Sequence, residues 1–152
     1  MSSITVEETY SIMHQVLEAL TYLHYKMIAH RDLKPANILV CARDPTLSVK
    51  VADFGASTEL ASDYLNTICG TRPYCAPEMW TGSYGRSVDI WALGVIGLQY
   101  STGLPPFPPN RQNYDWRTWI AKIRQVALGQ SVELDDRFRE GLECMLEAHP
   151  RD

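Results

Sequence analysis

The chain has 152 residues and a net charge of −4 at pH 7. That length suits one domain with a modest hydrophobic core and is too short for two domains of ordinary size. The charge argues against a nucleic-acid partner or an acidic membrane surface, and no stretch reaches the roughly 20 apolar residues of a membrane-spanning helix. No secretion signal opens the chain and its four cysteines lack metal-ligand spacing, so we expect reduced thiols in an intracellular protein, cytoplasmic or nuclear.

A first helix is expected from about residue 6 to residue 25. Thr5 and Glu8 have the spacing of a capping box, in which the Thr5 side chain accepts from the backbone and the Glu8 side chain reaches back. Four apolar residues follow at intervals that place them on one helical face: Ile12, Val16, Leu20 and Leu23.

Two short β-rich runs come next, at residues 38–40 and 48–51, and the turn-prone residues 43–46 separate them. This arrangement predicts a β-hairpin. The hairpin would hold the loop at residues 30–37 and the side chain of Asp53 on either side of one cleft.

The second half of the chain begins with residues 56–76, which are polar and predict an extended, mobile segment without regular elements. Residues 87–101 are apolar on almost every side, which is typical of a helix buried in the core. The proline-rich stretch 103–109 should end that helix. Two amphipathic helices are expected at about 116–128 and 136–148.

The residues that carry chemistry are concentrated in two short strings. Residues 30–37 read His-Arg-Asp-Leu-Lys-Pro-Ala-Asn, and Asp53-Phe54-Gly55 begins sixteen positions after Asn37. Together they offer one carboxylate for a substrate hydroxyl, and a second carboxylate with an amide for a divalent metal. Phosphoryl transfer from a nucleotide needs that set of groups, and both strings are protein-kinase signatures.

From about residue 5 to its end, the chain resembles the C-terminal lobe of a eukaryotic protein kinase domain of the serine/threonine type. The resemblance implies a mainly α fold with a short β-hairpin. One tripeptide such as Asp-Phe-Gly would be weak evidence, whereas five ordered strings are specific. They are His30–Asn37, Asp53–Gly55, Gly70-Thr71, Ala76-Pro77-Glu78, and Asp89-Ile90-Trp91 with Gly94.

The resemblance implies a role for each polar residue of the two strings, with ATP and Mg²⁺ as cofactors. Asp32 would accept or orient the proton of the attacking hydroxyl, and Lys34 would reach the γ-phosphate. Asn37 and Asp53 would bind Mg²⁺, a cation that prefers oxygen ligands. Lys34, Asn37 and Asp53 would thus form the nucleotide-binding set. Taken singly, Asp32 or Asp53 could equally be an ordinary turn or capping aspartate.

Two residues favour serine and threonine over tyrosine as the acceptor in protein substrates. Lys34, followed by proline, resembles serine/threonine kinases, because tyrosine kinases typically carry alanine and arginine in this loop. In the family, a threonine at the position of Thr71 bonds toward the catalytic Asp and Lys and shapes the substrate groove. The alternative for Thr71 is a generic turn threonine.

Arg31 and Thr67 are candidates for regulation. Family members with an arginine before the catalytic aspartate are often activated by phosphorylation of the activation segment, here residues 53–78, by an upstream kinase. Residues 56–59 lack the second basic residue of many relatives, so Arg31 would be the main partner of a phosphate on Thr67. A solvated polar loop is the alternative, and the rival sites are Ser57, Thr58, Ser62 and Tyr64.

Two acidic residues are expected to be structural. The resemblance implies that Asp89 bonds backbone amides of the 30–37 loop, a role compatible with stabilising a helix N-terminus. Glu78 pairs with an arginine near the end of the domain in relatives. Arg151 could replace that arginine here, although its spacing from Pro150 differs.

Several parts of the kinase pattern are missing from the sequence. No Gly-x-Gly-x-x-Gly occurs, and the 29 residues before His30 leave no room for an N-terminal lobe with its lysine, glutamate and adenine-binding hinge. The family's last helix is missing too. We therefore expect a fragment that is inactive alone, with an apolar surface where the other lobe would pack. The alternative is a truncated, non-catalytic kinase-like binding or scaffold protein.

Overall fold

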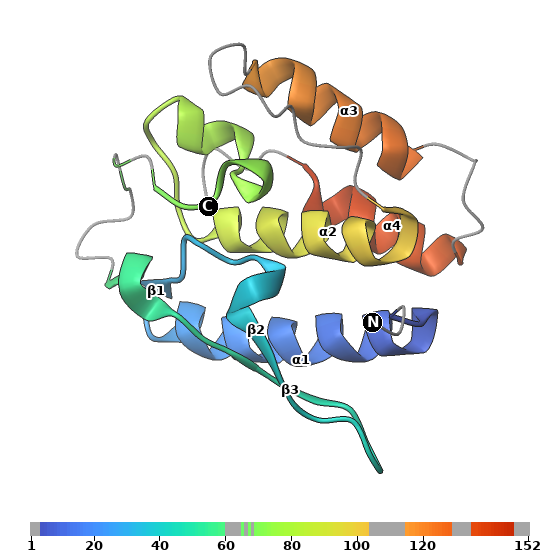
Figure 1. Cartoon of the computed structure of the whole chain (residues 1–152). Coiled ribbons are helices and arrows are strands. Elements are labelled where there is room, and N and C mark those ends of the chain that lie inside the picture. The colour runs from blue at the N-terminus through green and yellow to red at the C-terminus, as the bar shows by residue number, and fades with distance from the viewer. Residues whose placement is uncertain are drawn as a thin grey trace.

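A computed structural model describes residues 4–59, 65, 67, 69–103, 115–128 and 135–147. The described chain is mainly helical, with two small two-stranded sheets (Figure 1). Its α-helices are α1 (Val6–Tyr25), α2 (Ser87–Thr102), α3 (Trp116–Leu128) and α4 (Asp136–Met145). Its strands are β1 (Ile28–Ala29), β2 (Ile38–Ala42), β3 (Ser48–Val51) and β4 (Thr58–Glu59), and its 3-10 turns are η1 (Pro35–Asn37), η2 (Phe54–Ala56), η3 (Arg72–Tyr74) and η4 (Pro77–Trp80).

Helix α1 begins at a capping box. The Thr5 hydroxyl accepts from the Glu8 amide at 3.1 Å, and the Glu8 carboxylate accepts from the Thr5 amide at 3.0 Å. The apolar stripe expected from the sequence is buried and packs against α2 and β3. The helix ends at Tyr25, so the chain turns there toward the loop that carries His30.

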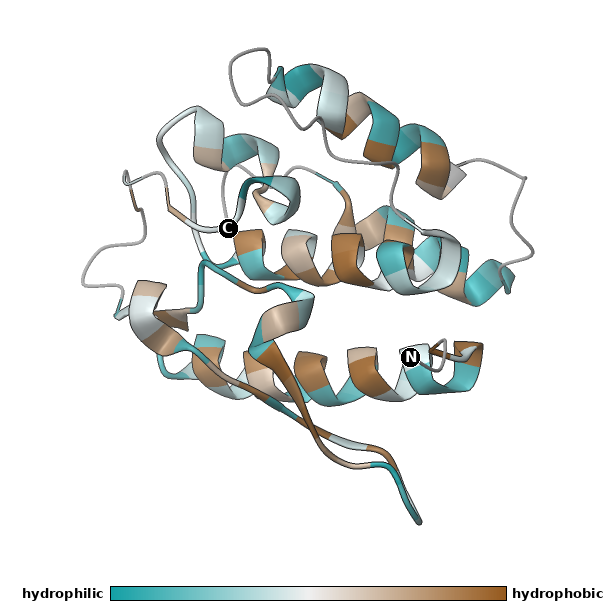
Figure 2. Ribbon diagram, viewed as in Figure 1, coloured by the Kyte–Doolittle hydropathy of each residue, from teal (hydrophilic) through white to brown (hydrophobic). Residues whose placement is uncertain are grey.

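Helix α2 is the centre of the core. It is hydrophobic around most of its circumference (Figure 2) and packs against α1, α3 and α4. In Figure 1, α1 lies on one side of α2 and α3 on the other. The helix ends one residue later than expected, and Gly103 caps it. The proline-rich residues 104–109 lie outside the described residues.

Strands β2 and β3 form the predicted antiparallel hairpin, with Ile38 opposite Val51 and Val40 opposite Val49. A second pair, β1 with β4, contradicts the expectation that residues 56–76 contain no regular element. Part of the same stretch forms η3. The expectation was wrong because β4 is only two residues long, and its partner β1 lies far away in the sequence.

The last two helices close the described core. α3 has the bounds expected from the sequence, while α4 ends at Met145, and a turn at Leu146 and Glu147 follows. Within the described parts of the chain, no helix combines the length and apolar character that crossing a membrane requires.

Candidate active site

Asp32, Lys34 and Thr71 form a compact polar cluster between two loops. The Lys34 ammonium lies 2.7 Å from Asp32 Oδ2, and the Thr71 hydroxyl donates to Asp32 Oδ1 at 2.6 Å. Lys34 Nζ also donates to the Thr71 hydroxyl at 3.1 Å. Asp32 and Lys34 belong to the catalytic loop, defined as residues 30–37, and Thr71 arrives from a segment 39 residues later than Asp32. The cluster thus joins the His30–Asn37 string to the Gly70-Thr71 string, which the sequence marks as separate motifs.

The contacts of Asp32 control its protonation. Burial would raise the pKa of this carboxyl, but hydrogen bonds from Lys34 and Thr71, with the Lys34 charge, outweigh burial and hold its pKa below the ordinary value. Asp32 is therefore ionised at neutral pH, with its oxygens facing a cation and a hydroxyl donor.

Asn37 and Asp53 lie at the same end of the β2–β3 hairpin. Asn37 immediately precedes Ile38, which pairs with Val51, and the Ala52 amide donates to the Asn37 carbonyl at 2.9 Å. The Asn37 side-chain amide donates to the Asp32 carbonyl at 2.8 Å, which ties this residue to the catalytic loop. Asp53 has a left-handed backbone, and its carboxylate accepts from the Gly55 amide at 3.3 Å.

Asp89, at the start of α2, fixes the backbone of the catalytic loop. Its carboxylate accepts from the His30 amide at 2.9 Å and from the Arg31 amide at 2.8 Å. His24 of α1 contributes Nε2 at 2.8 Å. The carboxylate is buried, and it connects the central helix directly to the residue before Asp32.

Arg31 and Thr67 share a hydrogen-bond partner, the phenol of the buried Tyr84. Tyr84 hydrogen-bonds both the Thr67 carbonyl and the Arg31 side chain, and it lies 3.8 Å from the Cys69 thiol. Burial raises the pKa of Tyr84 to about 12, so the phenol remains protonated. Arg31 Nε donates to the Ala56 carbonyl at 2.7 Å. The rival phosphosites Ser62 and Tyr64 lie outside the described residues.

The role of Tyr84 was not predicted from the sequence, because no sequence motif marks this residue. Tyr84 is one of eight tyrosines in the chain and belongs to none of the five strings. Its backbone pairs with Leu65, with hydrogen bonds of 2.9 and 3.2 Å, so the activation segment is bound by backbone and side chain together.

The substrate loop, defined as residues 71–75, is attached to two core helices. The Tyr74 phenol donates to Gln99 Oε1 of α2 at 2.7 Å, and the Trp119 indole of α3 donates to the Pro73 carbonyl at 3.0 Å. Glu78 follows in η4 and is buried; its candidate partner Arg151 lies outside the described residues.

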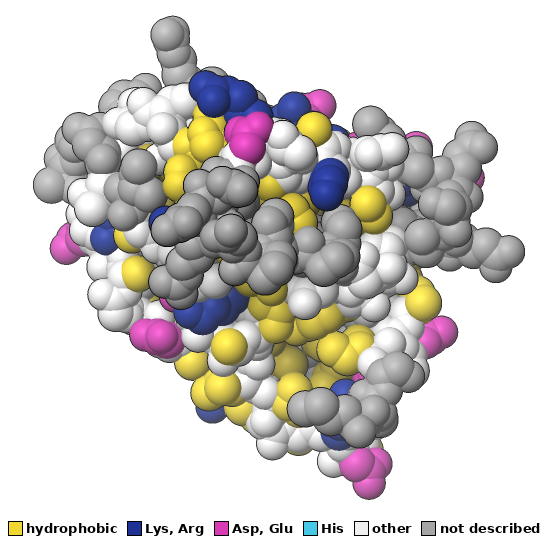
Figure 3. Space-filling model, turned by 45° about the horizontal axis from the view of Figure 1, so that its top comes forward, with side chains coloured by type: hydrophobic (Ala, Val, Ile, Leu, Met, Phe, Trp, Pro, Cys, Tyr) yellow, Lys and Arg dark blue, Asp and Glu magenta, His cyan; other side chains and the backbone are white. Residues whose placement is uncertain are grey.

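Apolar side chains are exposed beside the site. Leu39, Val40 and Phe54 are 51%, 52% and 49% exposed, and a pocket of about 350 Å³ opens nearby between α1 and β3. The Phe54 ring lines that pocket and also contacts the His30 ring edge-on, with 5.2 Å between the ring centroids. Figure 3 shows hydrophobic side chains reaching the surface of one face of the molecule.

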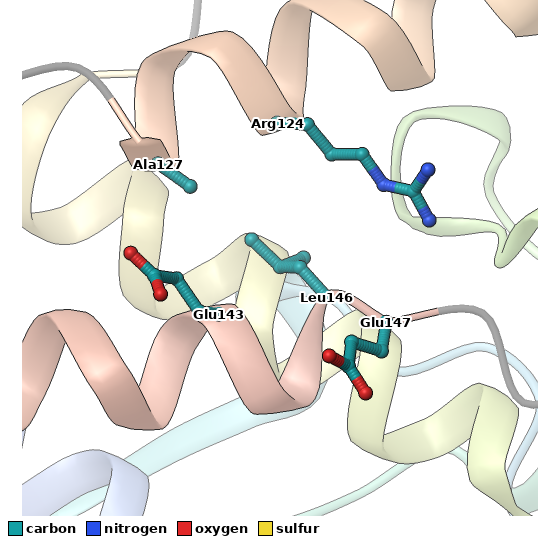
Figure 4. A pocket seen from close by; sticks show the side chains of 5 residues that line it. All are labelled: Arg124, Ala127, Glu143, Leu146 and Glu147. Atoms are coloured by element: carbon teal, nitrogen blue, oxygen red, sulfur yellow. The ribbon is translucent and has the colours of Figure 1, made fainter.

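A separate pocket lies between α3 and α4 and contains none of the candidate site residues. Figure 4 shows Arg124 of α3 reaching over it, with Glu143 and Glu147 along the opposite wall. Its volume is about 220 Å³. Opposite charges line this pocket, and neither the catalytic loop nor the substrate loop contributes to it.

Comparison with known proteins identifies the family. The sequence model described as "Protein kinase domain" matches residues 1–152. The chain is 41% identical to the phosphorylase b kinase gamma catalytic chain, liver/testis isoform, of Mus musculus, over 89% of this chain and 34% of that protein. It is 38% identical to Aurora kinase B of Drosophila melanogaster, over 84% of this chain and 37% of that protein.

A third relative is the calcium/calmodulin-dependent protein kinase type 1 of Macrobrachium nipponense, 41% identical over 69% of this chain and 31% of that protein. The chain thus spans about a third of the length of the curated relatives it matches. The family model covers the whole chain, and each of these relatives is more than 30% identical to it over at least two thirds of its length. The chain belongs to the protein kinase domain family.

Proposed function

We propose that this chain forms the acceptor and metal half of a serine/threonine protein kinase site, which transfers the γ-phosphate of ATP to hydroxyls of protein substrates. The observation that carries the proposal is the contact of Asp32 with both Lys34 and Thr71. A carboxylate held ionised between a cation and a hydroxyl can receive a proton from a second hydroxyl placed against it.

The chain's own residues would act in one step. Asp32 orients the substrate hydroxyl and takes its proton as the oxygen bonds to the γ-phosphorus and the bond to the leaving ADP breaks. Lys34 offsets the negative charge that builds up on the transferring phosphoryl oxygens. Thr71 holds the side chains of Asp32 and Lys34 at fixed positions relative to each other through its two hydrogen bonds.

Asn37 and Asp53 are the residues suited to Mg²⁺. An amide oxygen and a carboxylate are hard donors, and Mg²⁺ is usually bound through one or two carboxylates together with substrate phosphates and water. When bound, the metal supplies charge neutralisation between the β- and γ-phosphates. The bond from the Asn37 amide nitrogen to the Asp32 carbonyl would orient the amide oxygen for this role.

Regulation through Thr67 and Arg31 is part of the proposal. Thr67 is exposed, while its carbonyl and the Arg31 side chain share Tyr84 as a partner. A phosphate placed on Thr67 by an upstream kinase would therefore form within reach of a guanidinium, the group best suited to bind it bidentately.

The nucleotide half of the site would have to pack on the exposed apolar surface around Leu39, Val40 and Phe54. That surface and the α1–β3 pocket beside it also favour a second candidate function, a non-catalytic module that binds a partner protein there.

One experiment tests both candidates. Two proteins are compared, one consisting of residues 1–152 and one expressed from the complete genomic locus. Transfer of ³²P from labelled ATP by each protein is measured on a pool of serine/threonine peptides and, separately, on a pool of tyrosine peptides. We expect the protein from the complete locus to label the serine/threonine pool and Asp32→Asn to abolish this labelling, whereas residues 1–152 alone should transfer no phosphate. Labelling that survives Asp32→Asn, or labelling of the tyrosine pool alone, would contradict the proposal. Absence of transfer from both proteins would favour the binding module.

A further inference from the structure

Three parts of the protein hold the substrate loop: the catalytic loop, helix α2 and helix α3. Thr71 is bound to Asp32 and Lys34, Tyr74 to Gln99 of α2, and Pro73 to Trp119 of α3. The first contact faces the catalytic loop, whereas the other two come from the helical core. Residues 71–75 therefore cannot shift as a unit without breaking a polar contact to the core.

The Trp119 contact joins elements that are far apart in sequence. Its indole Nε1 donates to the Pro73 carbonyl at 3.0 Å, across 46 residues, and the side chain is only 2% exposed. Helix α3 itself is fixed by packing against α2 and α4. Because Pro73 is two residues from Thr71, the bond fixes the backbone next to the hydroxyl that contacts Asp32.

Burial alone does not explain this hydrogen bond. Trp91 of α2 is 1% exposed, and its indole Nε1 has no hydrogen-bond partner among the described residues. A buried tryptophan in this core therefore folds without such a bond. The Trp119 indole, in contrast, donates to a carbonyl of the loop whose Thr71 contacts both Asp32 and Lys34.

We propose that Trp119 is a positioning residue for the protein substrate, because its N–H holds the substrate loop at the place where the acceptor peptide must lie beside Asp32. This inference rests on the proposed kinase function. It makes α3 part of the substrate-binding apparatus, whereas the residues proposed for the phosphate and the metal lie in the catalytic loop and at Asp53. Loss of the bond should therefore weaken binding of the peptide and leave handling of ATP unchanged.

The test compares Trp119→Phe with Trp91→Phe, two substitutions that remove the same atoms from buried sites. Only the first removes a hydrogen bond to the loop. The first readout needs no activity: deuterium exchange of the Tyr74 and Cys75 amides, which bond within the loop, and alkylation of the Cys75 thiol. Cys75 is buried, and burial raises its pKa to about 12, so it reacts slowly while the loop is ordered.

We expect Trp119→Phe to speed both reactions about 2- to 10-fold, the effect of one net hydrogen bond, and Trp91→Phe to leave them unchanged.

The second readout is steady-state kinetics, in which Trp119→Phe should raise the peptide KM by a similar factor at unchanged kcat and ATP KM. Equal exchange and alkylation rates in wild type and Trp119→Phe would overturn the inference. Faster exchange and alkylation with an unchanged peptide KM would overturn it too. If the protein expressed from the complete genomic locus transfers no phosphate, the proposed function fails, and positioning of a substrate by Trp119 fails with it. The exchange data still decide whether the bond orders the loop.

Discussion

The hydroxyl of Thr71 lies 2.6 Å from a carboxylate oxygen of Asp32, although 39 residues separate them in the chain. The same hydroxyl accepts from Lys34 at 3.1 Å, so one side chain bridges both members of the Asp32–Lys34 ion pair. This geometry sets the charge state of Asp32 and the distance between the catalytic and substrate loops.

Removal of the Thr71 hydroxyl is expected to disturb Asp32 directly. In Thr71→Ala the carboxylate loses a hydrogen bond that stabilises its charged form, so the pKa of Asp32 should rise toward its ordinary value of 3.8. If the protein is a kinase, kcat/KM should fall about tenfold or more, the usual effect of losing a hydrogen bond to a charged group. A carbon-detected NMR titration of the Asp32 carboxyl measures the pKa.

Thr71→Ser is the matched control, because it keeps the hydroxyl and removes only a methyl group. It should retain the low pKa of Asp32 and most of the activity. If the pKa of Asp32 were the same in the alanine and serine variants, the Thr71 contact would not control this carboxyl.

The low pKa of Asp32 also predicts how stability depends on pH. A carboxyl whose pKa is lower in the folded than in the unfolded chain stabilises the fold above its unfolded pKa, and this contribution is lost as the pH falls through the folded value. Asp32→Asn should therefore be less stable than wild type at pH 7, and the gap should close in acid, below the ordinary value of 3.8. Urea unfolding from pH 7 to pH 3 tests this, and a gap that stayed constant would contradict it.

Asp89 is expected to be the most sensitive polar position of the core. Its buried carboxylate accepts from two backbone amides of the catalytic loop and lies 2.8 Å from His24 Nε2. Asp89→Ala leaves these donors without an acceptor and should lower the free energy of unfolding by about 3 kcal/mol. Urea denaturation measures the loss.

The exposed Glu18, in contrast, pairs with His14 on the surface of α1 at 3.7 Å. Glu18→Ala should change stability by less than about 0.5 kcal/mol and serves as the control. An Asp89→Ala protein as stable as Glu18→Ala would show that the three contacts contribute little.

The sequence was informative wherever the signal is local. A capping box and an apolar stripe predicted α1, and an apolar stretch predicted α2. Two β-rich runs on either side of a turn predicted the β2–β3 hairpin. Asp32 and Asp53 were found because their neighbours in sequence form recognisable strings. These features depend on residues a few positions apart, which periodicity and motif spacing capture.

Contacts between distant segments had no such signal. Tyr84 joins Arg31 to Thr67, and Trp119 joins α3 to Pro73, yet neither residue lies in a motif that marks this role. β4 was missed for the same reason, because a two-residue strand exists only through its partner. Tertiary packing determines these contacts, so a single sequence did not reveal them.

Gly70 and Gly82 allow backbone strain to be separated from crowding at the site. Both have positive φ angles, +89° and +86°, at which any other residue is strained by roughly 1–2 kcal/mol. A Cβ at Gly82 meets nothing within 4 Å, whereas a Cβ at Gly70 would lie 2.4 Å from the Arg31 carbonyl oxygen, which belongs to the catalytic loop.

Gly82→Ala should therefore lower the free energy of unfolding by about 1 kcal/mol, and Gly70→Ala by a further 1–3 kcal/mol, roughly the range for overpacked sites. The extra loss arises because the methyl group added in Gly70→Ala would push the substrate loop away from Arg31 and so lengthen the Thr71–Asp32 contact. Urea unfolding gives the two free energies, and the NMR titration of Asp32 should show a raised pKa in Gly70→Ala alone. Equal destabilisation by both substitutions, with an unchanged Asp32, would mean that the two loops can separate without cost.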